Sequence, residues 1–449
     1  MAATKKDQNL QDERIYRIPT NKSGKSSNSE NPTSDKWEIP RDWEATKLRM
    51  ENLKKIEFGE VAELRKEKFN PLTSNETKPC LELEHFEQVT GKINGYVSSA
   101  EQKSIKNVFY KGDVLFGKLR PYLRKYWLAE FDGVCSSEVW VLKPKTKDIS
   151  NEYLFNLIQT NDFIQAANVS SGSKMPRADW DYIINFPFSI INSKIEQKAI
   201  AQVLSTADAA IHTTEKLISQ KILRKKWLMQ QLLTGKKRLK GFEGEWKEHS
   251  FEKILKVVKR NFDWDENELY KLISVRRRSG GIFYREALYG HQILVKTLRT
   301  ANEGDFLFSK MQILHGASAL VAKEFEGAKI SGSYIAVVPK EKNQLNMEFF
   351  QWYSQTPYFY HQTYISSYGV HIEKMTFDFD TFLQLEMKLP SIEEQTAIAQ
   401  VLQAADREIS VLKAKAEKLR EQKKGLMQVL LTGKIRLNYD SSDFYDGHD

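Results

Sequence analysis

The sequence contains the stretch Glu196-Gln197-Lys198-Ala199-Ile200-Ala201-Gln202-Val203-Leu204 and repeats it as Glu394-Gln395-Thr396-Ala397-Ile398-Ala399-Gln400-Val401-Leu402. The repeat extends to a second shared stretch, Leu228-Met229-Gln230-Gln231-Leu232-Leu233-Thr234-Gly235-Lys236 against Leu426-Met427-Gln428-Val429-Leu430-Leu431-Thr432-Gly433-Lys434. Residues 193–239 align on 391–437 without a gap, and roughly half of the positions match, against about one in fifteen expected by chance. An internal duplication therefore organises the 449-residue chain.

Each copy is predicted to form one long helix with both ends marked. The N-termini carry the Ser-x-x-Glu pattern of a capping box, and the C-termini carry a glycine suited to a left-handed residue. These residues are Ser193, Glu196 and Gly235 in the first copy and Ser391, Glu394 and Gly433 in the second. At 1.5 Å per residue, about 40 residues give a helix on the order of 60 Å long.

The apolar residues of both copies recur in steps of four and three, which is the pattern of a coiled-coil seam. The seam residues are Ile200, Leu204, Ala207, Ile211, Ile218 and Ile222, interrupted by Thr214, and Ile398, Leu402, Ala405, Ile409, Leu412, Ala416 and Leu419. In one interpretation, each copy packs against an unrelated partner helix in its own domain. We favour pairing of the two helices with each other in antiparallel orientation, because each follows its own globular segment.

The globular segments, about 37–190 and 243–389, share a pattern of their own. Gly112-Asp113 and Gly304-Asp305 each predict a turn followed by a buried strand. Further along, Cys135–Pro144 resembles Ile330–Pro339, and both are predicted to be strands closed by proline. Helical segments are expected around residues 151–164 and 346–360. The fold class predicted for each segment is therefore α+β.

The two globular segments diverge in their basic loops. Arg276-Arg277-Arg278, followed by Ser279-Gly280-Gly281, has no counterpart in the first segment. Arg120, Arg124 and Lys125, with Tyr122 and Tyr126 between them, have no close counterpart in the second. Neutral drift of surface loops is one interpretation of this difference. Recognition of two different targets by one shared scaffold is the other.

The composition favours a folded protein with a polyanionic partner. The net charge is +9, and a basic excess of this kind is most often found in nucleic-acid-binding proteins. No apolar run resembles a signal sequence or a membrane span, so a cytoplasmic location is expected. The two cysteines, Cys80 and Cys135, predict neither a disulfide framework nor a metal site.

Catalytic motifs are not evident in the sequence. It contains no Asn/Asp-Pro-Pro-Tyr/Phe motif of an amino-methyltransferase, no phosphate-binding loop and no Pro-Asp…Glu-x-Lys nuclease pattern. The eight histidines show no metal-ligand spacing. His315 and His371 lie near glycine and serine, where a loop histidine is more often solvated or binding than catalytic. We therefore expect a chain without catalytic or metal-binding residues.

This pattern resembles the specificity subunit of type I restriction–modification enzymes. Two divergent segments alternate with two long helices, which open with Glu-Gln-x-x-Ile-Ala and close with Leu-Leu-Thr-Gly-Lys, and the linker Gly241–Trp246 opens the second unit. The resemblance implies two target recognition domains alternating with two helices that pair as an antiparallel coiled coil. The expected divisions are a disordered arm (1–36), domain 1 (37–190), helix 1 (191–240), domain 2 (241–389), helix 2 (390–437) and an acidic tail (438–449).

The resemblance also implies what the chain binds. Each domain would read one half of a bipartite, asymmetric site in double-stranded DNA, and the helices would fix the distance between the halves. Two methyltransferase subunits holding S-adenosylmethionine would dock on the chain, joined by restriction subunits that use ATP and Mg²⁺. The chain itself would bind no cofactor and serve phage defence as a non-catalytic subunit.

Arginine and amide side chains read base edges, whereas lysine and serine often hold phosphates. On this basis the predicted DNA-binding residues of domain 1 are Lys118, Arg120, Tyr122, Arg124, Ser171, Ser173, Lys174 and Arg177. Those of domain 2 are Arg276, Arg277, Arg278, Lys310, Ser367, Tyr368, His371 and Lys374.

Three other functions compete with this interpretation. A stand-alone bipartite DNA-binding regulator would have the same layout but no methyltransferase partner. A nuclease–methylase fusion would carry the motifs that are missing here. A purely structural coiled-coil scaffold would not explain two folded domains with basic loops.

Overall fold

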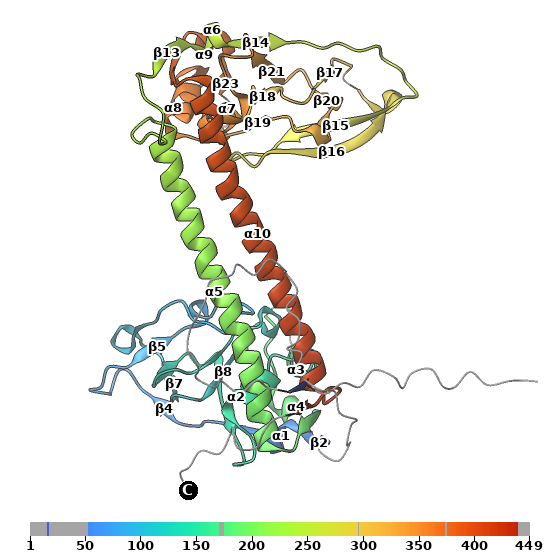
Figure 1. The fold of residues 1–449 in the computed structure, drawn as a ribbon. Coiled ribbons are helices and arrows are strands. Elements are labelled where there is room, and N and C mark those ends of the chain that lie inside the picture. Colours follow the sequence, from blue (N-terminus) through green and yellow to red (C-terminus); the bar gives the residue numbers. More distant parts are fainter. Residues whose placement is uncertain (1–15, 18–52, 170–174, 295, 373–374, 439–449) are drawn as a thin grey trace, which may run out of the picture. The chain divides into compact units, whose positions relative to one another are not determined.

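The computed structural model describes residues 16–17, 53–169, 175–294, 296–372 and 375–438 (Figure 1). The chain forms two compact units. Unit 1 comprises Met1–Thr213 and Ala416–Asp449, and unit 2 comprises Thr214–Lys415. The two units divide at residues 213/214 and 415/416, inside the two long helices. These divisions differ in kind from the domain boundaries predicted from the sequence, and those boundaries stay predictions.

The two predicted long helices are present and equal in length. Helix α5 spans Lys194–Leu232 and helix α10 spans Ile392–Leu430, with 39 residues each. Gly235 and Gly433 have φ angles of 69° and 67°, which confirms the left-handed residue expected after each helix. No helix within the described ranges is both long and apolar enough to cross a membrane.

The serine of each predicted capping box is in place. The hydroxyl of Ser193 accepts a hydrogen bond from the backbone N–H of Glu196 at 3.4 Å, and Ser391 accepts one from Glu394 at 3.3 Å. Each glutamate carboxylate also pairs with an arginine that follows the end of the other helix. The serine half of the predicted capping box is therefore confirmed, and the reciprocal half stays a prediction.

The helices run antiparallel within each unit. In unit 1, Glu196 near the start of α5 binds Arg436 just beyond α10, and Asp208 binds Lys423 at 2.8 Å. A step forward along α5 is thus matched by a step backward along α10. The apolar cluster of unit 1 includes residues from both helices, which confirms the predicted antiparallel pairing there.

Unit 2 repeats this arrangement with the equivalent residues. Glu394 binds Arg238, and Asp406 binds Lys225. One further pair, Lys221 with Glu408, occurs only in unit 2 among these ion pairs, because alanine and leucine stand at the corresponding positions of unit 1. The duplication seen in the sequence is therefore also a duplication of helix-to-helix ion pairs.

The predicted seam is correct for most of its residues but wrong at one end. Ile200, Leu204 and Ile211 are buried, as predicted. Thr214 is also buried, so it belongs to the seam that it was expected to interrupt. Ile222 is 45% exposed and does not belong to it. Apolar periodicity alone therefore does not determine which residues of the helix are covered.

Unit 1 contains two main sheets and a short strand pair. The first sheet has the order β3-β11-β8-β9 and the second the order β4-β7-β10-β5-β6, while β2 pairs with β12. Their bounds are β2 Leu53–Glu57, β3 Ala62–Leu64, β4 Lys68–Phe69, β5 Pro79–Leu81, β6 Val97–Ser98, β7 Lys106–Phe109, β8 Val114–Gly117, β9 Tyr126–Leu128, β10 Gly133–Cys135, β11 Val139–Pro144 and β12 Pro187–Ile191. β1 (Tyr16–Arg17) pairs in parallel with β25 (Leu437–Asn438), and the rest of the predicted arm and tail lies outside the described residues.

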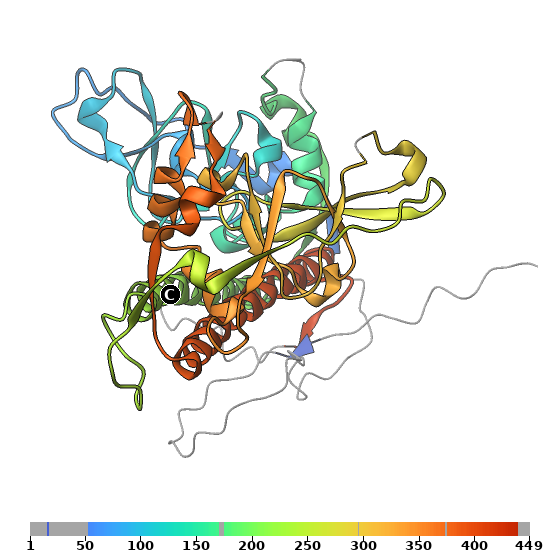
Figure 2. The same cartoon turned by 90° about the horizontal axis from the view of Figure 1, so that it is seen from above.

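Unit 2 has the corresponding sheets, β14-β21-β18-β19 and β16-β15-β20-β17, with the pairs β13-β24 and β22-β23. Their bounds are β13 Lys247–Ser250, β14 Leu255–Val258, β15 Leu269–Val275, β16 Ile282–Tyr289, β17 Arg299–Thr300, β18 Phe306–Ser309, β19 Ser318–Leu320, β20 Lys329–Ile330, β21 Tyr334–Pro339, β22 Ser367–Tyr368, β23 Thr376–Phe377 and β24 Glu386–Leu389. The β15–β16 hairpin extends away from the helices of its own unit in Figure 1 and Figure 2. The predicted α+β class, with strands β11 and β21 closed by proline, is confirmed.

Short helices pack against one sheet of each unit, α2 against strands β8, β9 and β11 and α7 against β19. The predicted helical segments each form two helices rather than one, because Thr160 and Thr356 cap the second helix of each pair through their hydroxyls. The bounds are α1 Phe58–Val61, α2 Asn151–Leu157, α3 Asn161–Asn168 and α4 Trp180–Ile184 in unit 1, and α6 Phe251–Ile254, α7 Met347–Tyr353, α8 Pro357–Ile365 and α9 Phe379–Leu383 in unit 2.

The predicted Gly-Asp turns are confirmed, and the aspartates have a structural role. Gly112 and Gly304 adopt positive φ angles of 91° and 86°. Asp113 is buried and accepts two hydrogen bonds from Arg65 at 2.7 and 2.8 Å. This contact raises the pKa of Arg65 above its ordinary value. Asp305 receives an arginine in the same way in unit 2, so both turns are held to the sheet by a buried charged contact.

Candidate nucleic-acid interface

The loop between β8 and β9 carries half of the predicted binding residues of unit 1, Lys118, Arg120, Tyr122 and Arg124. The backbone N–H of Lys118 donates to the carbonyl of Glu138 at 2.9 Å, and its carbonyl accepts from the N–H of Ala178 at 2.8 Å. A single 3₁₀ turn, Pro121–Leu123, follows. The start of the loop is therefore fixed between two neighbouring segments of the same unit.

Two side chains of this loop are exposed and free. Arg120 is exposed, and Tyr122 keeps 52% of its surface accessible. Neither side chain has a hydrogen-bond or charged partner among the described residues. Arg120 also has a φ of 54°, a left-handed conformation that costs roughly 1–2 kcal/mol for a residue other than glycine. Strained residues of this kind gather at binding sites, so Arg120 is the strongest candidate of the loop.

Other basic residues of the loop are bound to their own unit. Arg124 donates to the side-chain oxygen of Asn161 at 2.7 Å. Lys125 donates to the carbonyl of Leu83 at 2.5 Å, and partial burial lowers its pKa. These contacts hold the loop in place, so Arg124 is a supporting residue rather than a free donor.

Arg177 lies beside this loop through a β-bridge with Leu119. Its guanidinium binds the carboxylate of Glu138 at 3.1 Å, and this hydrogen bond raises the pKa of Arg177. Because the pair is exposed, it contributes little to stability. The remaining predicted residues of unit 1, Ser171, Ser173 and Lys174, lie outside the described residues.

Unit 2 contains a loop of the same length at the equivalent place. Lys310 follows β18, a 3₁₀ turn occupies Ile313–His315, and β19 begins at Ser318. The backbone N–H of Lys310 donates to the carbonyl of Ser333 at 2.9 Å and its carbonyl accepts from the N–H of Phe377 at 3.0 Å, as in unit 1. After the first lysine, the basic side chains of the unit 1 loop have no basic counterpart in this loop, as the sequence indicated. The backbone also differs at the third position, where φ is 54° at Arg120 and −129° at Gln312.

The left-handed position that closes this loop differs between the units. It is Arg124 in unit 1, with φ of 51°, and Gly316 in unit 2, with φ of 71°. A side chain at Gly316 would collide with the hydroxyl of Tyr360. Tyr360 was not predicted from the sequence, because nothing in its local pattern distinguishes it from the other aromatic residues of its helix.

The triple-arginine turn joins the same surface of unit 2. This turn connects β15 to β16, and its Arg278 donates a backbone hydrogen bond to His315 at 2.6 Å. Ser279 donates to Gly316 at 2.9 Å, and its hydroxyl lies 3.0 Å from that of Tyr360. Residues far apart in the sequence therefore lie side by side in unit 2.

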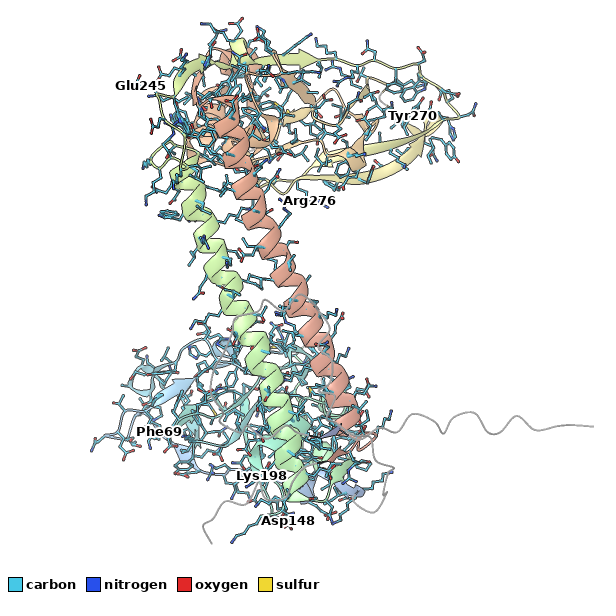
Figure 3. All side chains as sticks on the ribbon, in the orientation of Figure 1. Phe69, Asp148, Lys198, Glu245, Tyr270 and Arg276 are labelled. Carbon is cyan, nitrogen blue, oxygen red and sulfur yellow. The ribbon has the colours of Figure 1, made fainter. Side chains whose placement is uncertain are left out.

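The three arginines differ in their intramolecular contacts and backbone conformation. Arg276 lies over the ring of Phe283 at 4.4 Å, and in Figure 3 it lies at the opposite end of the hairpin from Tyr270. Arg277 is exposed but has an intramolecular contact. Arg278 is exposed in a left-handed conformation, with φ of 57°. The turn thus presents positive charge with a fixed backbone.

Of the remaining predicted residues of unit 2, three lie within the described residues. Ser367 donates its hydroxyl to the carbonyl of Thr363 at 2.7 Å, so that hydroxyl is already engaged. Tyr368 is 65% exposed, and His371 is exposed. Strand β22 brings Tyr368 to the loop, because β22 pairs with β23 and Phe377 of β23 binds Lys310. Lys374 lies outside the described residues.

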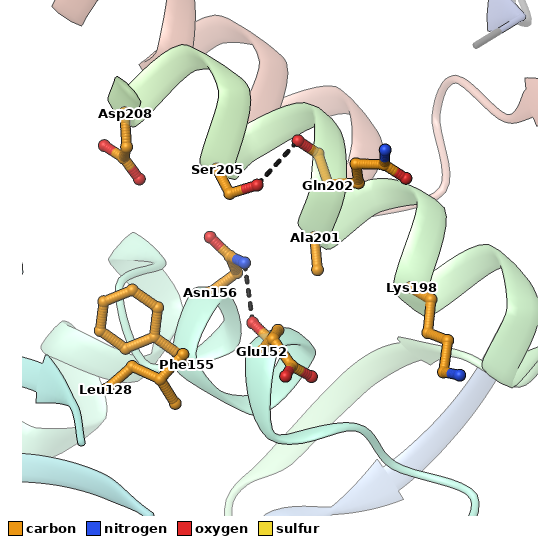
Figure 4. Close-up of a pocket in the computed structure, with 9 residues that line it drawn as sticks. All are labelled: Leu128, Glu152, Phe155, Asn156, Lys198, Ala201, Gln202, Ser205 and Asp208. Carbon is orange, nitrogen blue, oxygen red and sulfur yellow. Dashed lines mark hydrogen bonds between the residues drawn. The ribbon is translucent and has the colours of Figure 1, made fainter. Parts of the chain in front are cut away.

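Two hollows among the described residues are lined by none of the predicted residues. A groove of about 320 Å³ in unit 1 lies between α2 and α5 (Figure 4). It is lined by Leu128, Glu152, Phe155, Asn156, Lys198, Ala201, Gln202, Ser205 and Asp208. A second hollow of about 330 Å³ in unit 2 is lined by residues 261–264 and 296–299. Within the described ranges no group of three or more His, Cys, Asp or Glu residues could hold a metal ion.

The arginine that pairs with each helix-starting glutamate was not predicted from the sequence. Arg238 and Arg436 occupy equivalent positions just beyond the two helices. Their carboxylate partners, Glu394 and Glu196, are both nearly inaccessible to solvent. The signal was present in the sequence, because both the arginine and the glutamate are identical in the two copies of the repeat.

Comparison with known proteins agrees with this architecture. Residues 50–224 and 254–421 match the model of the type I restriction modification DNA specificity domain. The chain is 26% identical over 439 residues to the putative type I restriction enzyme MjaX specificity subunit of Methanocaldococcus jannaschii, covering 89% of this chain and 95% of that one. It is 31% identical over 193 residues to the EcoDI specificity subunit of Escherichia coli, covering 42% of this chain and 41% of that subunit.

Solved structures share the fold. A chain from a study of complex assembly and conformational transition of the type I R-M system matches with a TM-score of 0.57 at 17% identity, covering 87% of this chain and all of that one. The type I S subunit from M. genitalium matches with a TM-score of 0.54 at 12% identity, covering 86% and 98%. With two recognition-type units, paired long helices and a family match over most of its length, the chain belongs to the type I restriction–modification DNA specificity subunits.

Proposed function

We propose that this chain is the DNA-recognition subunit of a type I restriction–modification complex and that it reads a bipartite, asymmetric site in double-stranded DNA. One observation carries the proposal. The two units present loops of equal length after β8 and β18, each anchored in the same way at its first lysine, with different side chains at the following positions. Two such modules in one chain suit two half-sites that differ in sequence.

The charge distribution supports DNA as the ligand. Lys118 and Lys310 occupy equivalent positions and start the two loops. Arg120 in unit 1 and Arg278 in unit 2 add exposed guanidinium groups on fixed backbones. Phosphate contacts supply sequence-independent affinity, and base contacts supply specificity, so both kinds of donor are needed on one surface.

A second repeated surface supports docking of two copies of one partner. Several exposed polar residues of the long helices are identical in both copies of the repeat, and their side chains have no partner among the described residues. In unit 1 these are Gln202, Lys424 and Gln428, and in unit 2 they are Gln400, Lys226 and Gln230. Each unit thus offers the same polar group from the start of one helix and the end of the other.

We assign this repeated surface to two methyltransferase subunits. On this proposal the chain is non-catalytic and binds no cofactor itself. S-adenosylmethionine would be held by the methyltransferase subunits, and ATP and Mg²⁺ by restriction subunits that join the complex. The chemistry would be adenine methylation or DNA cleavage carried out by those partners.

Selection of DNA from a random duplex pool tests the recognition part. The purified full-length chain, with and without its methyltransferase subunits, should enrich a motif with two defined halves separated by an unspecified spacer. A single continuous motif, or no motif, would contradict the proposal.

Replacing Gln202, Lys424 and Gln428 by alanine should reduce the number of bound methyltransferase subunits from two to one in native mass spectrometry. Specific DNA binding without any methyltransferase binding would instead indicate a stand-alone regulator.

A further inference from the structure

We propose that Arg120 reads a guanine base in the half-site bound by unit 1, an inference that rests on the proposed function. The loop after β8 and the loop after β18 can be compared position by position, because they connect equivalent pairs of strands, β8–β9 and β18–β19. Lysine is retained at the first position, as Lys118 and Lys310. Two residues later the side chains differ, with Arg120 in unit 1 and Gln312 in unit 2.

This difference separates two roles. Every half-site has the same phosphates, so a residue that holds phosphate can be the same in both units. A residue that reads bases must differ if the two half-sites differ. Lys118 and Lys310 fit the first role, and the position of Arg120 and Gln312 fits the second.

The backbone of Arg120 is fixed although its side chain is free. Its N–H donates to the carbonyl of Pro176 at 2.8 Å, and its carbonyl accepts from Leu123 at 2.9 Å. Pro121 follows Arg120 directly, and its ring fixes the φ angle at position 121. The guanidinium has no partner among the described residues. A fixed backbone with a free donor head lowers the entropy that is lost when a ligand binds.

Guanine is the base that matches this donor group. The planar guanidinium offers two parallel N–H donors, and guanine presents two acceptors, O6 and N7, in the major groove. The neighbouring arginines cannot act in this way without breaking their own contacts. Arg124 is bound to Asn161, and Arg177 is bound to Glu138. Arg120 is therefore the one of these three that can approach a base without such a loss.

Unit 2 offers no guanidinium at the equivalent point. The side-chain oxygen of Gln312 is buried and has no hydrogen-bond partner within the described residues. The amide is therefore only partly available at the surface. The guanine specified by Arg120 should for this reason appear in one half of the motif and not at the matching place in the other half.

Selection from a random duplex pool, using the full-length chain with its methyltransferase subunits, tests this assignment. The variants are Arg120→Gln and Arg120→Lys, with Lys147→Gln as a control that removes one exposed positive charge of unit 1 outside the predicted DNA-binding residues. Arg120→Gln should lose roughly 5- to 150-fold discrimination at a single guanine of one half-site, as expected for one bidentate base contact. The other half-site should be unchanged.

Each control has its own expected result. Arg120→Lys keeps the charge but lacks two parallel donors, so it should also lose most of the preference for guanine while keeping the salt dependence of binding. Lys147→Gln should leave the motif intact. Thermal unfolding of all three variants should match the wild type, because no described interaction depends on the side chain of Arg120 or of Lys147.

Several results would overturn the assignment. An unchanged motif for Arg120→Gln would exclude base reading, and uniform weakening over all sequences would indicate a phosphate contact instead. The same loss of a base preference in Lys147→Gln would show that the effect comes from the lost charge and not from base reading by Arg120. If the wild-type chain itself yields no two-part motif, the proposed function fails, and this outcome is distinct from a two-part motif that ignores Arg120.

Discussion

Arg436 and Glu196 form a buried ion pair although 240 positions separate them in the sequence. Their side chains are 9% and 1% exposed, respectively. The equivalent pair of unit 2, Arg238 and Glu394, has its arginine 26% exposed. Each pair fastens the start of one long helix to the segment that follows the other.

Removing one partner of the buried pair should be costly. Glu196→Gln leaves the Arg436 guanidinium buried without its counter-charge, so the free energy of unfolding of unit 1 should fall by about 3–5 kcal/mol. Glu394→Gln should cost less, because Arg238 can still reach water. The exposed neighbour Glu393→Gln is the control, with a change within about 0.5 kcal/mol. Urea unfolding measures all three, and equal losses for Glu196 and Glu394 would contradict the role of burial.

The left-handed position of the recognition loop gives an asymmetric prediction. Gly316→Ala should destabilise unit 2 by about 2 kcal/mol or more, because it adds the left-handed penalty of about 1–2 kcal/mol to a collision with Tyr360. Arg124→Gly should change unit 1 by less than about 1 kcal/mol, since relief of backbone strain offsets the greater freedom of glycine in the unfolded chain. Thermal unfolding distinguishes these cases.

A second substitution isolates the collision. In a Tyr360→Ala background, Gly316→Ala should cost only the left-handed penalty. If its cost in that background is as large as in the wild type, the Tyr360 hydroxyl does not constrain the loop.

The triple-arginine turn should contribute phosphate affinity without sequence preference. Replacing Arg276, Arg277 and Arg278 by glutamine should weaken DNA binding at every sequence. The slope of log affinity against log salt should fall by about 0.9 for each phosphate that the protein no longer neutralises. Arg285→Gln serves as the control, because Arg285 lies on the same hairpin but is paired with Glu286. An affinity that stays unchanged across a salt series would remove the turn from the interface.

The spacer between half-sites should follow the length of the long helices. Seven residues inserted into both helices, near Ser219 and near Ala414, keep the ion pairs on either side in register. They add about 10 Å to each helix, which corresponds to about three base pairs of spacer. Methylome mapping should show a longer gap and unchanged halves.

An unchanged gap would contradict a role of the helices as a ruler. Insertion into α5 alone is the control for this experiment. It shifts Lys221 and Lys225 relative to Glu408 and Asp406, so it should impair binding rather than lengthen the spacer.

Sequence patterns were sufficient where the structure depends on local signals or on the duplication. The long helices, their serine caps, Gly235 and the strands closed by Pro144 and Pro339 all follow from propensity, capping and periodicity. The antiparallel pairing follows because each globular segment precedes its own helix.

Tertiary partners could not be predicted in the same way. Glu196 was assigned to a local capping box, and it also binds Arg436 from a distant part of the chain. Ile222 fits the apolar period but is 45% exposed. The loops after β8 and β18 are anchored in the same way at their first lysine, which their differing side chains do not reveal in the sequence. Among the predicted site residues, Arg124 and Arg177 proved to be bound within their own unit.

Unit 2 is one continuous run of chain, whereas unit 1 joins residues 1–213 to residues 416–449. During synthesis, the apolar face of Ile200 and Leu204 leaves the ribosome long before Leu430 and Leu431, with which it shares a core. At 5–20 residues per second, the delay is roughly 10–45 s. In this interval unit 2 can fold while unit 1 remains open. The first domain to be made is thus the last to be closed, and chaperones that cover apolar surface should bind the nascent chain at this stage.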